Sequence, residues 1–97
     1  MLKINYMSTL FVGIDVSSKS NAVYAMDFDE NKYIDAFFGN NQPGADELAG
    51  KIAGCMQKHP HLNTIIVALE STSVYSIHIA NFLASCELLM PYKPYVY

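Results

Sequence analysis

The sequence predicts an α/β domain built on a mixed β-sheet. Two short runs of apolar residues, many of them β-branched, are typical of strands buried in the middle of a sheet; they span residues 10–16 and 64–69. Between them lie two weaker strand patterns and one amphipathic helical pattern. These observations favour two adjacent parallel strands joined by a right-handed helical crossover, with an antiparallel meander beside them.

Length and composition indicate one small domain. The chain has 97 residues, of which 52% are hydrophobic. We expect a leader at residues 1–9 and the domain at residues 10–97. No long uncharged span suits a membrane helix or a signal peptide, so we expect a soluble, cytoplasmic protein. Cys55 and Cys86 each fall in a helical pattern without a partner at metal-ligand spacing, which indicates reduced cysteines.

The charge balance argues against strong binding of nucleic acid. The chain carries six basic residues, all of them lysine, against nine acidic residues, for a net charge of −3. Arginine, which makes bidentate contacts to guanine and phosphate, is absent, and no basic patch is visible in the sequence. We therefore expect this chain by itself to bind DNA or RNA weakly.

The first strand pattern, Leu10–Val16, contains one carboxylate, Asp15, near its C-terminal end. Side chains alternate across a strand, so we expect two faces, Val12, Ile14 and Val16 against Phe11, Gly13 and Asp15. Gly13 leaves open space beside the carboxylate. A buried aspartate needs a hydrogen-bond donor, a cation or a metal. The alternative is that Asp15 caps the following turn through its own backbone.

The antiparallel meander continues with two more strands. Residues 20–28 alternate, which predicts a partly covered strand, and residues 32–38 form the third strand pattern. The polar residues 29–31 predict a hairpin loop between them, and residues 39–42 end the third strand.

A helix is expected next, starting near Asn41 or Gln42 and ending by residues 58–60. Pro43 suits its first turn, and Asp46 and Glu47 are expected to interact favourably with the helix dipole. The apolar stripe is expected to contain Leu48, Ile52 and either Cys55 or Met56.

The last third predicts a strand, a helix and a partial strand. The strand spans residues 64–69 and ends at Glu70. The helix runs from about Ser73 to Glu87, with a cap among residues 71–73 and one apolar face made of Ile79, Phe82, Leu83 and Cys86. His78 has no potential ligand one turn away, which favours a surface or packed histidine. Residues 95–97 begin a fifth strand pattern.

The predicted topology brings two acids together. If the two apolar strands are adjacent and parallel, Asp15 and Glu70 meet at their carboxyl ends, where open α/β sheets bind ligands. Ile66, Ala68 and Glu70 share one face, and Ala68 is small, as Gly13 is. Two neighbouring carboxylates repel unless a positive charge lies between them. Mg²⁺ or Mn²⁺ prefers oxygen ligands and few carboxylates, so the sequence predicts a divalent-cation site.

The resemblance to a known family is carried by three segments: residues 13–19, residues 38–41 with Gly44, and residues 69–75. Together they resemble motifs of the amino-terminal catalytic domain of the DEDD transposases, insertion-sequence enzymes with a RuvC-like, ribonuclease-H-like fold that are related to the pilin-gene invertases. Residues 13–19, Gly-Ile-Asp-Val-Ser-Ser-Lys, resemble the opening block that carries the first acid. Residues 38–41 with Gly44 resemble the step into the helix. Residues 69–75, Leu-Glu-Ser-Thr-Ser-Val-Tyr, resemble the block of the second acid, with Ser73 where the family usually has glycine.

The resemblance, which covers residues 11–97, implies Mg²⁺-dependent cleavage and transfer of DNA strands in transposition and recombination. Asp15 and Glu70 would be catalytic metal ligands, and two ions about 4 Å apart would serve the reaction. Ser17, Ser18 and Lys19 are candidates for contact with the DNA backbone, although a solvated turn is the alternative. DNA is the implied partner, and use of a guide RNA is left open.

The family's two further aspartates and its second domain would follow beyond Tyr97. We therefore expect residues 10–97 to be an incomplete N-terminal part of the catalytic domain, which binds Mg²⁺ or Mn²⁺ weakly and cleaves nothing alone. Uncovered sheet surface should favour self-association.

Two other functions remain open. A fragment of an actin-like or sugar-kinase ATPase also begins with an apolar strand, an aspartate and a Ser/Thr turn, but such turns usually carry glycines that approach phosphate. The second alternative is a non-catalytic interaction module in which the acids are structural.

Overall fold

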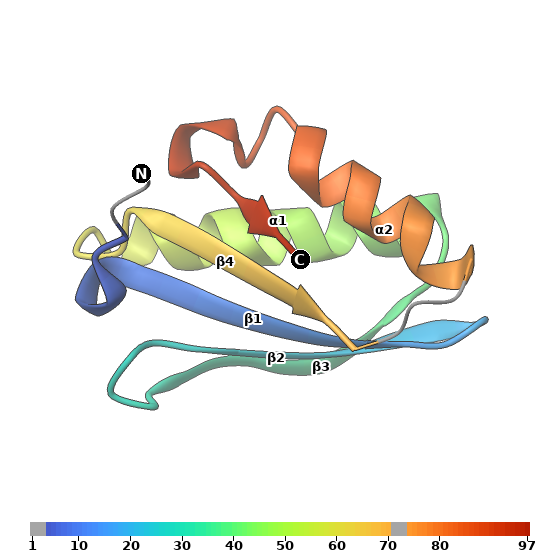
Figure 1. The fold of residues 1–97 in the computed structure, drawn as a ribbon, viewed down its shortest axis with the longest axis horizontal. Coiled ribbons are helices and arrows are strands. Elements are labelled where there is room, and N and C mark those ends of the chain that lie inside the picture. Colours follow the sequence, from blue (N-terminus) through green and yellow to red (C-terminus); the bar gives the residue numbers. More distant parts are fainter. Residues whose placement is uncertain (1–3, 71–73) are drawn as a thin grey trace.

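A five-stranded sheet forms the centre of the protein, with strand order β3-β2-β1-β4-β5 (Figure 1). The computed structural model describes residues 4–70 and 74–97. The strands are β1 (Thr9–Val16), β2 (Ser20–Met26), β3 (Lys32–Gly39), β4 (Thr64–Leu69) and β5 (Tyr95–Val96). The helices are α1 (Gln42–Lys58) and α2 (Val74–Ser85), and two short 3-10 turns are η1 (Tyr6–Ser8) and η2 (Met90–Tyr92).

The sheet is mixed, as the sequence predicts. β1 pairs with β2 and β2 pairs with β3 in antiparallel fashion, while β1 pairs with β4 and β4 with β5 in parallel. The crossover between β1 and β4 passes through α1. The predicted order of three antiparallel strands, helix, parallel strand, helix and partial fifth strand is therefore confirmed.

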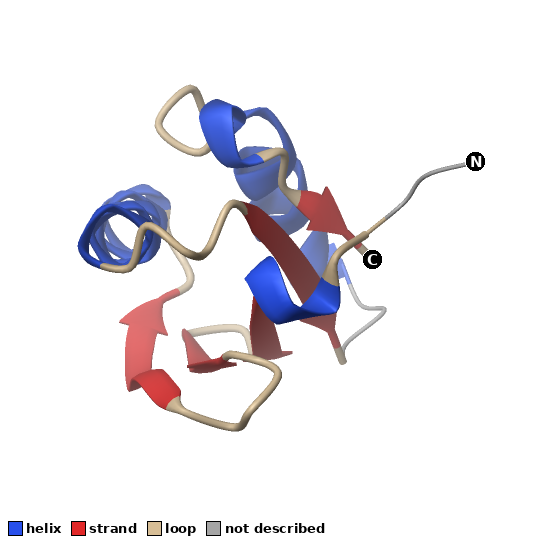
Figure 2. Cartoon of the chain, turned by 90° about the vertical axis from the view of Figure 1, so that its left-hand side faces the viewer, coloured by secondary structure: helices blue, strands red, loops and turns tan. Residues whose placement is uncertain are grey.

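Both helices pack on the same face of the sheet, which leaves the opposite face uncovered (Figures 1 and 2). The predicted division of β1 is confirmed, because Val12, Ile14 and Val16 are buried whereas Gly13 and Asp15 are exposed. The core combines the covered face of the sheet with the apolar stripes of the helices. Its fully buried large side chains include Leu10, Ile14, Leu48, Ile52, Met56, Ile65, Ile79, Leu83 and Leu89.

The β2–β3 hairpin is closed by a buried carboxylate. The expected second strand ran to Phe28, but β2 ends at Met26 because Asp27 turns its side chain into the loop. The Asp27 carboxylate accepts hydrogen bonds from the Asn31 backbone N–H at 2.9 Å, the Asn31 side-chain amide at 2.9 Å and the Tyr33 hydroxyl at 2.7 Å. The hydrogen bond from the Asn31 side chain is the main cause that lowers the pKa of Asp27 to about 2. The hydrogen bond to Asp27 raises the pKa of Tyr33 to about 12.

Helix α1 begins as predicted, but its charges are placed differently. The Asn41 side chain is the N-cap and accepts a hydrogen bond from the Gly44 N–H at 2.8 Å. No acidic residue lies in the first turn, so the expected interaction of Asp46 and Glu47 with the helix dipole is wrong; Asp46 instead accepts a hydrogen bond from the Gln42 side chain at 3.0 Å. The buried stripe takes Met56, while Cys55 is half-buried.

Helix α2 is shorter than expected. It ends at Ser85, whose hydroxyl donates to the Asn81 carbonyl at 2.8 Å, and not at Glu87. The expected cap at residues 71–73 lies outside the described residues. His78 is exposed beside the Phe82 ring, as the surface interpretation predicts, and both cysteines are free. Among the helices of residues 4–70 and 74–97, none is long and apolar enough to cross a membrane.

Candidate metal centre

The backbone ladder between β1 and β4 makes Asp15 and Glu70 neighbours. The parallel pairing runs from Thr9 opposite Thr64 to Ile14 opposite Leu69. The Glu70 N–H then donates to the Ile14 carbonyl at 3.1 Å, which extends the same register to Asp15 and Glu70. Adjacent strands are about 4.8 Å apart, so the two carboxylates start from backbone positions at roughly that separation.

Both carboxylates belong to the uncovered face of the sheet and line one pocket of about 270 Å³. Gly13 and Ala68 are directly paired one row earlier on this face, so no large side chain covers the acids from that side. A Cβ on Gly13 would meet nothing within 4 Å except the Tyr24 carbonyl oxygen at 3.8 Å. The pocket is lined by Gly13, Ile14, Asp15, Ala22, Val23, Tyr24, Asp35, Ala36, Phe37 and Glu70.

No cation neutralises the two acids within the described part of the chain. The ion pair found among residues 4–70 and 74–97 joins Lys32 to Asp35 at 3.5 Å, and neither Asp15 nor Glu70 takes part in it. The same residues contain no cluster of three or more histidines, cysteines and acids able to hold a metal. Two exposed carboxylates nonetheless match Mg²⁺, which is usually bound by one or two carboxylates and keeps several waters.

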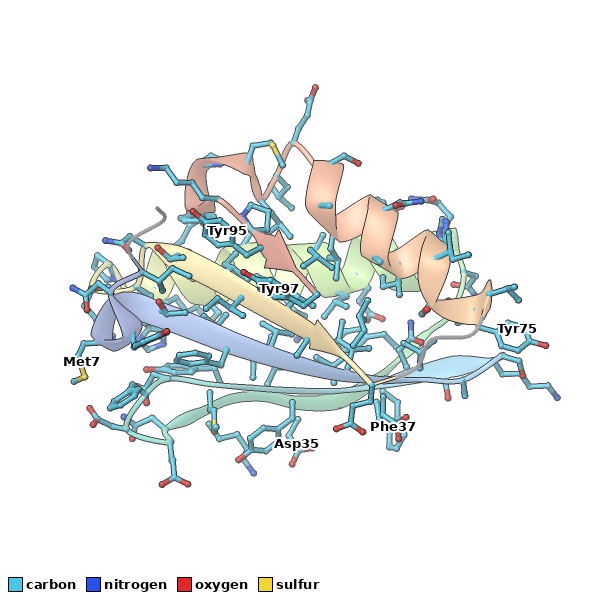
Figure 3. All side chains as sticks on the ribbon, viewed as in Figure 1. Met7, Asp35, Phe37, Tyr75, Tyr95 and Tyr97 are labelled. Atoms are coloured by element: carbon cyan, nitrogen blue, oxygen red, sulfur yellow. The ribbon has the colours of Figure 1, made fainter. Side chains whose placement is uncertain are left out.

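Asp35 is a third acid in this pocket that the sequence analysis missed. It lies on β3 in the row Ala68, Gly13, Tyr24 and Asp35, one row before Asp15 and two strands away. Strand spacing and rise put its Cα about 12 Å from that of Asp15, too far to share one ion. In Figure 3 Asp35 and Phe37 point away from the helices. In the sequence, Asp35 looks like any charge on a solvent-facing strand position.

The residues after β1 form a tight turn. The Ser17 hydroxyl donates to the Ser20 carbonyl at 2.6 Å and accepts from the Ser20 N–H at 3.2 Å. This hydroxyl therefore serves the turn, as the alternative interpretation holds. Ser18 and Lys19 are exposed at the same end of the sheet as the two acids.

Asn40 holds this end of the molecule together, a role that the sequence did not reveal. Its side-chain amide donates to the Ser17 carbonyl at 2.7 Å and to the Tyr75 carbonyl at 3.2 Å. Its backbone N–H donates to the Lys19 carbonyl at 3.0 Å. Asn40 thus connects the end of β3, the β1–β2 turn and the first turn of α2. It stabilises the turn that follows Asp15.

Comparison with protein families gives one match, which covers nearly the whole chain. A family model for DEDD transposases of the IS110 group, described as "Transposase", matches residues 12–96. No curated protein sequence matches the chain.

Two solved structures show the same fold. A Bacteroides thetaiotaomicron protein with an actin-like ATPase fold and unknown function superposes with a TM-score of 0.55 at 9% identity, over 93% of this chain and 33% of that one. Marinitoga piezophila Argonaute in complex with a 5′-OH guide RNA gives a TM-score of 0.52 at 14% identity, over 86% of this chain and 16% of that one. The chain thus spans a third or less of these structures, and its ribonuclease-H-like sheet is confirmed.

Proposed function

Because this chain belongs to the family of DEDD transposases, we propose that Asp15 and Glu70 are the first two metal ligands of a domain that cleaves and transfers DNA strands. One observation carries the proposal: two exposed carboxylates stand in register on adjacent parallel strands, at a pocket, with no cation beside them in the described residues. Without a bound cation, two neighbouring carboxylates repel each other and do not stabilise the fold.

The chain's own residues orient the acids. β1 and β4 are held by their ladder, so each carboxylate is fixed at its backbone, and Gly13 and Ala68 leave space for a hydrated ion and a phosphate oxygen. Asp15, on the central strand, and Glu70, at the end of β4, would together hold the ion. When bound, Mg²⁺ or Mn²⁺ activates a water or 3′-hydroxyl and stabilises the leaving oxygen of a phosphodiester.

Two acids alone should hold such an ion weakly. Mg²⁺ leaves its hydration shell reluctantly, and two carboxylates supply few of its ligands. We expect millimolar affinity and no cleavage of DNA by the 97-residue chain. Ser18 and Lys19, exposed at the same end, are proposed to face the DNA backbone, while Ser17 acts through the turn. Use of a guide RNA and self-association of the chain remain predictions.

Binding of Mn²⁺ tests the role of the acids. If the Kd is about 1 mM, 10 mM Mn²⁺ should stabilise the chain by about 1.4 kcal/mol, which corresponds to a rise in Tm of roughly 6–11 °C. Asp15→Asn and Glu70→Gln should each abolish this rise. Asp35→Asn is the matched control. It removes a charge from the same pocket, with its Cα about 12 Å from that of Asp15, and should keep the rise in Tm.

An equal loss in all three variants would show that Mn²⁺ responds to the general negative charge of the pocket, and would contradict the proposal. Nicking of branched DNA by the pure chain would contradict the expected inactivity. The likeness to an actin-like fold keeps an ATPase function as the alternative. A rise in Tm with Mg·ATP that exceeds the rise with Mg²⁺ alone would favour that alternative.

A further inference from the structure

Three of the six lysines line one groove between β3 and α1. The groove has a volume of about 480 Å³. It is lined by Lys32, Tyr33, Ile34, Gly50, Lys51, Gly54, Cys55, Lys58 and His59. The lysines come from three separate places in the sequence, which is why no basic patch is visible there. Folding brings them to one groove.

Helix α1 contributes two lysines and two glycines to the wall of the groove. Lys51 and Lys58 are seven residues apart, two helical turns or about 10.5 Å along the axis. Gly50 and Gly54 lie on the same groove, and a Cβ on either would meet no atom within 4 Å. Packing therefore does not require glycine at these positions, although each glycine in a helix interior costs about 1 kcal/mol relative to alanine. Glycine at these two positions leaves the backbone of α1 accessible from the groove.

The positive charges of this groove are largely uncompensated. Lys51 and Lys58 take part in no ion pair within the described residues, and Lys32 pairs with Asp35 at 3.5 Å with both side chains more than half exposed. An exposed pair of this kind contributes little and is easily exchanged. The nearest buried carboxylate, Asp27, is already bound by Asn31 and Tyr33.

We propose that this groove binds the sugar–phosphate backbone of a nucleic acid. Two lysines held two helical turns apart can contact separate phosphates of one strand. A partner protein is usually held by apolar or aromatic anchors in a buried centre. Here the apolar residue Ile34 is itself buried in the core, and Tyr33 directs its hydroxyl to Asp27. The groove thus offers charge and backbone access but no anchor pocket.

The position of the groove fits the proposed chemistry, on which this inference rests. Phe37 stands in the same row as Asp15 across the sheet, and Lys32 lies five residues earlier on β3. Strand rise and spacing put Lys32 roughly 20 Å from Asp15, about six base-pair steps. The groove thus lies within the length of a 20-base-pair duplex from the two acids.

Salt-dependent binding of a fluorescent 20-base-pair DNA duplex, and of an RNA duplex of the same sequence, tests the groove. EDTA is present throughout, so that metal binding does not contribute. Three phosphate contacts predict a slope of about −2.7 in log K against log salt, and about 40-fold weaker binding at 200 mM than at 50 mM. Lys58→Gln should reduce the slope by about 0.9 and weaken binding about tenfold at 50 mM.

Lys93→Gln is the matched control, because it removes the same charge from the residue after η2, outside the groove. It should leave the slope unchanged. An equal effect of the two substitutions, or no binding by the parent chain at 25 mM salt, would overturn the proposal. So would tighter, lysine-dependent binding of poly-glutamate, which would indicate an acidic protein partner. Binding of either duplex with the expected slope supports it, and the stronger duplex identifies the partner as DNA or RNA.

Asp15→Asn separates this proposal from the one on metal binding. In EDTA it should leave the slope of duplex binding unchanged, because Asp15 is not in the groove. Lysine-dependent binding together with a failed Mn²⁺ test would retain the groove and reject the metal site, and the reverse result would do the opposite. Thermal denaturation of every variant shows whether a loss of binding reflects unfolding.

Discussion

Replacing Gly44 by alanine should destabilise the protein strongly. Gly44 is buried in the first turn of α1, against the end of β3. A Cβ at this position would lie 2.6 Å from the carbonyl carbon of Gly39 and 2.7 Å from its nitrogen, with the carbonyl oxygen closer still. Cβ atoms in proteins essentially never approach other atoms within 3.0 Å. Because the clash is with backbone, α1 and β3 would have to separate.

The magnitude follows from two terms. Overpacking of this kind costs about 1–3 kcal/mol. The movement also weakens the hydrogen bond from the Gly44 N–H to the Asn41 side chain, an N-cap interaction worth about 1 kcal/mol. We expect a loss of roughly 2–4 kcal/mol, which for a chain of this length lowers the Tm by about 8–32 °C.

Urea denaturation followed by circular dichroism at the helix band measures this loss, with Gly50→Ala and Gly54→Ala as matched controls. Neither control meets another atom within 4 Å, so each should gain up to about 1 kcal/mol from helix propensity. A loss below about 1 kcal/mol for Gly44→Ala, or a comparable loss in the controls, would refute the reasoning that a close backbone approach fixes this glycine.

Three further predictions concern single side chains. In EDTA, Asp15→Asn should raise the Tm by a few degrees, because it removes a repulsion with Glu70 of roughly 1 kcal/mol in a water-like dielectric; a lower Tm would indicate a structural aspartate. Asn21→Leu should also raise the Tm, because the Asn21 amide is 1% exposed and neither its nitrogen nor its oxygen has a partner in the described structure, a cost of about 1–3 kcal/mol; a lower Tm would mean that the amide is satisfied. Asp27→Asn should lower the Tm at neutral pH. Because the pKa of Asp27 falls from 3.8 to about 2 on folding, the difference in Tm from the parent chain should hold above pH 4 and vanish as the pH falls to about 2. A pH-independent difference in Tm would contradict this cause.

The parts of the fold that could be predicted are those set by local patterns. Alternation in β1 and β2 assigned each side chain to a face, and the continuous apolar run of β4 identified it as a central strand. The meeting of Asp15 and Glu70 followed from the rule that a helical crossover joins parallel strands. Only the position of each acid at its strand end was needed, and both positions can be read from the sequence.

What could not be predicted depends on contacts between distant segments. Asp35 reaches the pocket of Asp15 through two successive antiparallel registers, and a shift of either register would move it elsewhere. Asn40 binds two carbonyls that lie 23 and 35 residues away. The start of α1 was predicted correctly, but the role of its acids was not: with Asn41 as the cap, Asp46 falls beyond the first turn.

The hydrogen bond from the Glu70 N–H to the Ile14 carbonyl implies that Glu70 keeps its orientation only if the length of β4 changes by an even number of residues. Adding or deleting one residue within β4, after its pairing with β1 has begun, would turn Glu70 toward the helices and bring a neighbouring side chain to the pocket in its place. A change of two residues would restore the orientation but move the acid by about 7 Å along the strand. Length variation should therefore be absorbed in the loop of residues 59–63, ahead of the strand, where it leaves both acids in step.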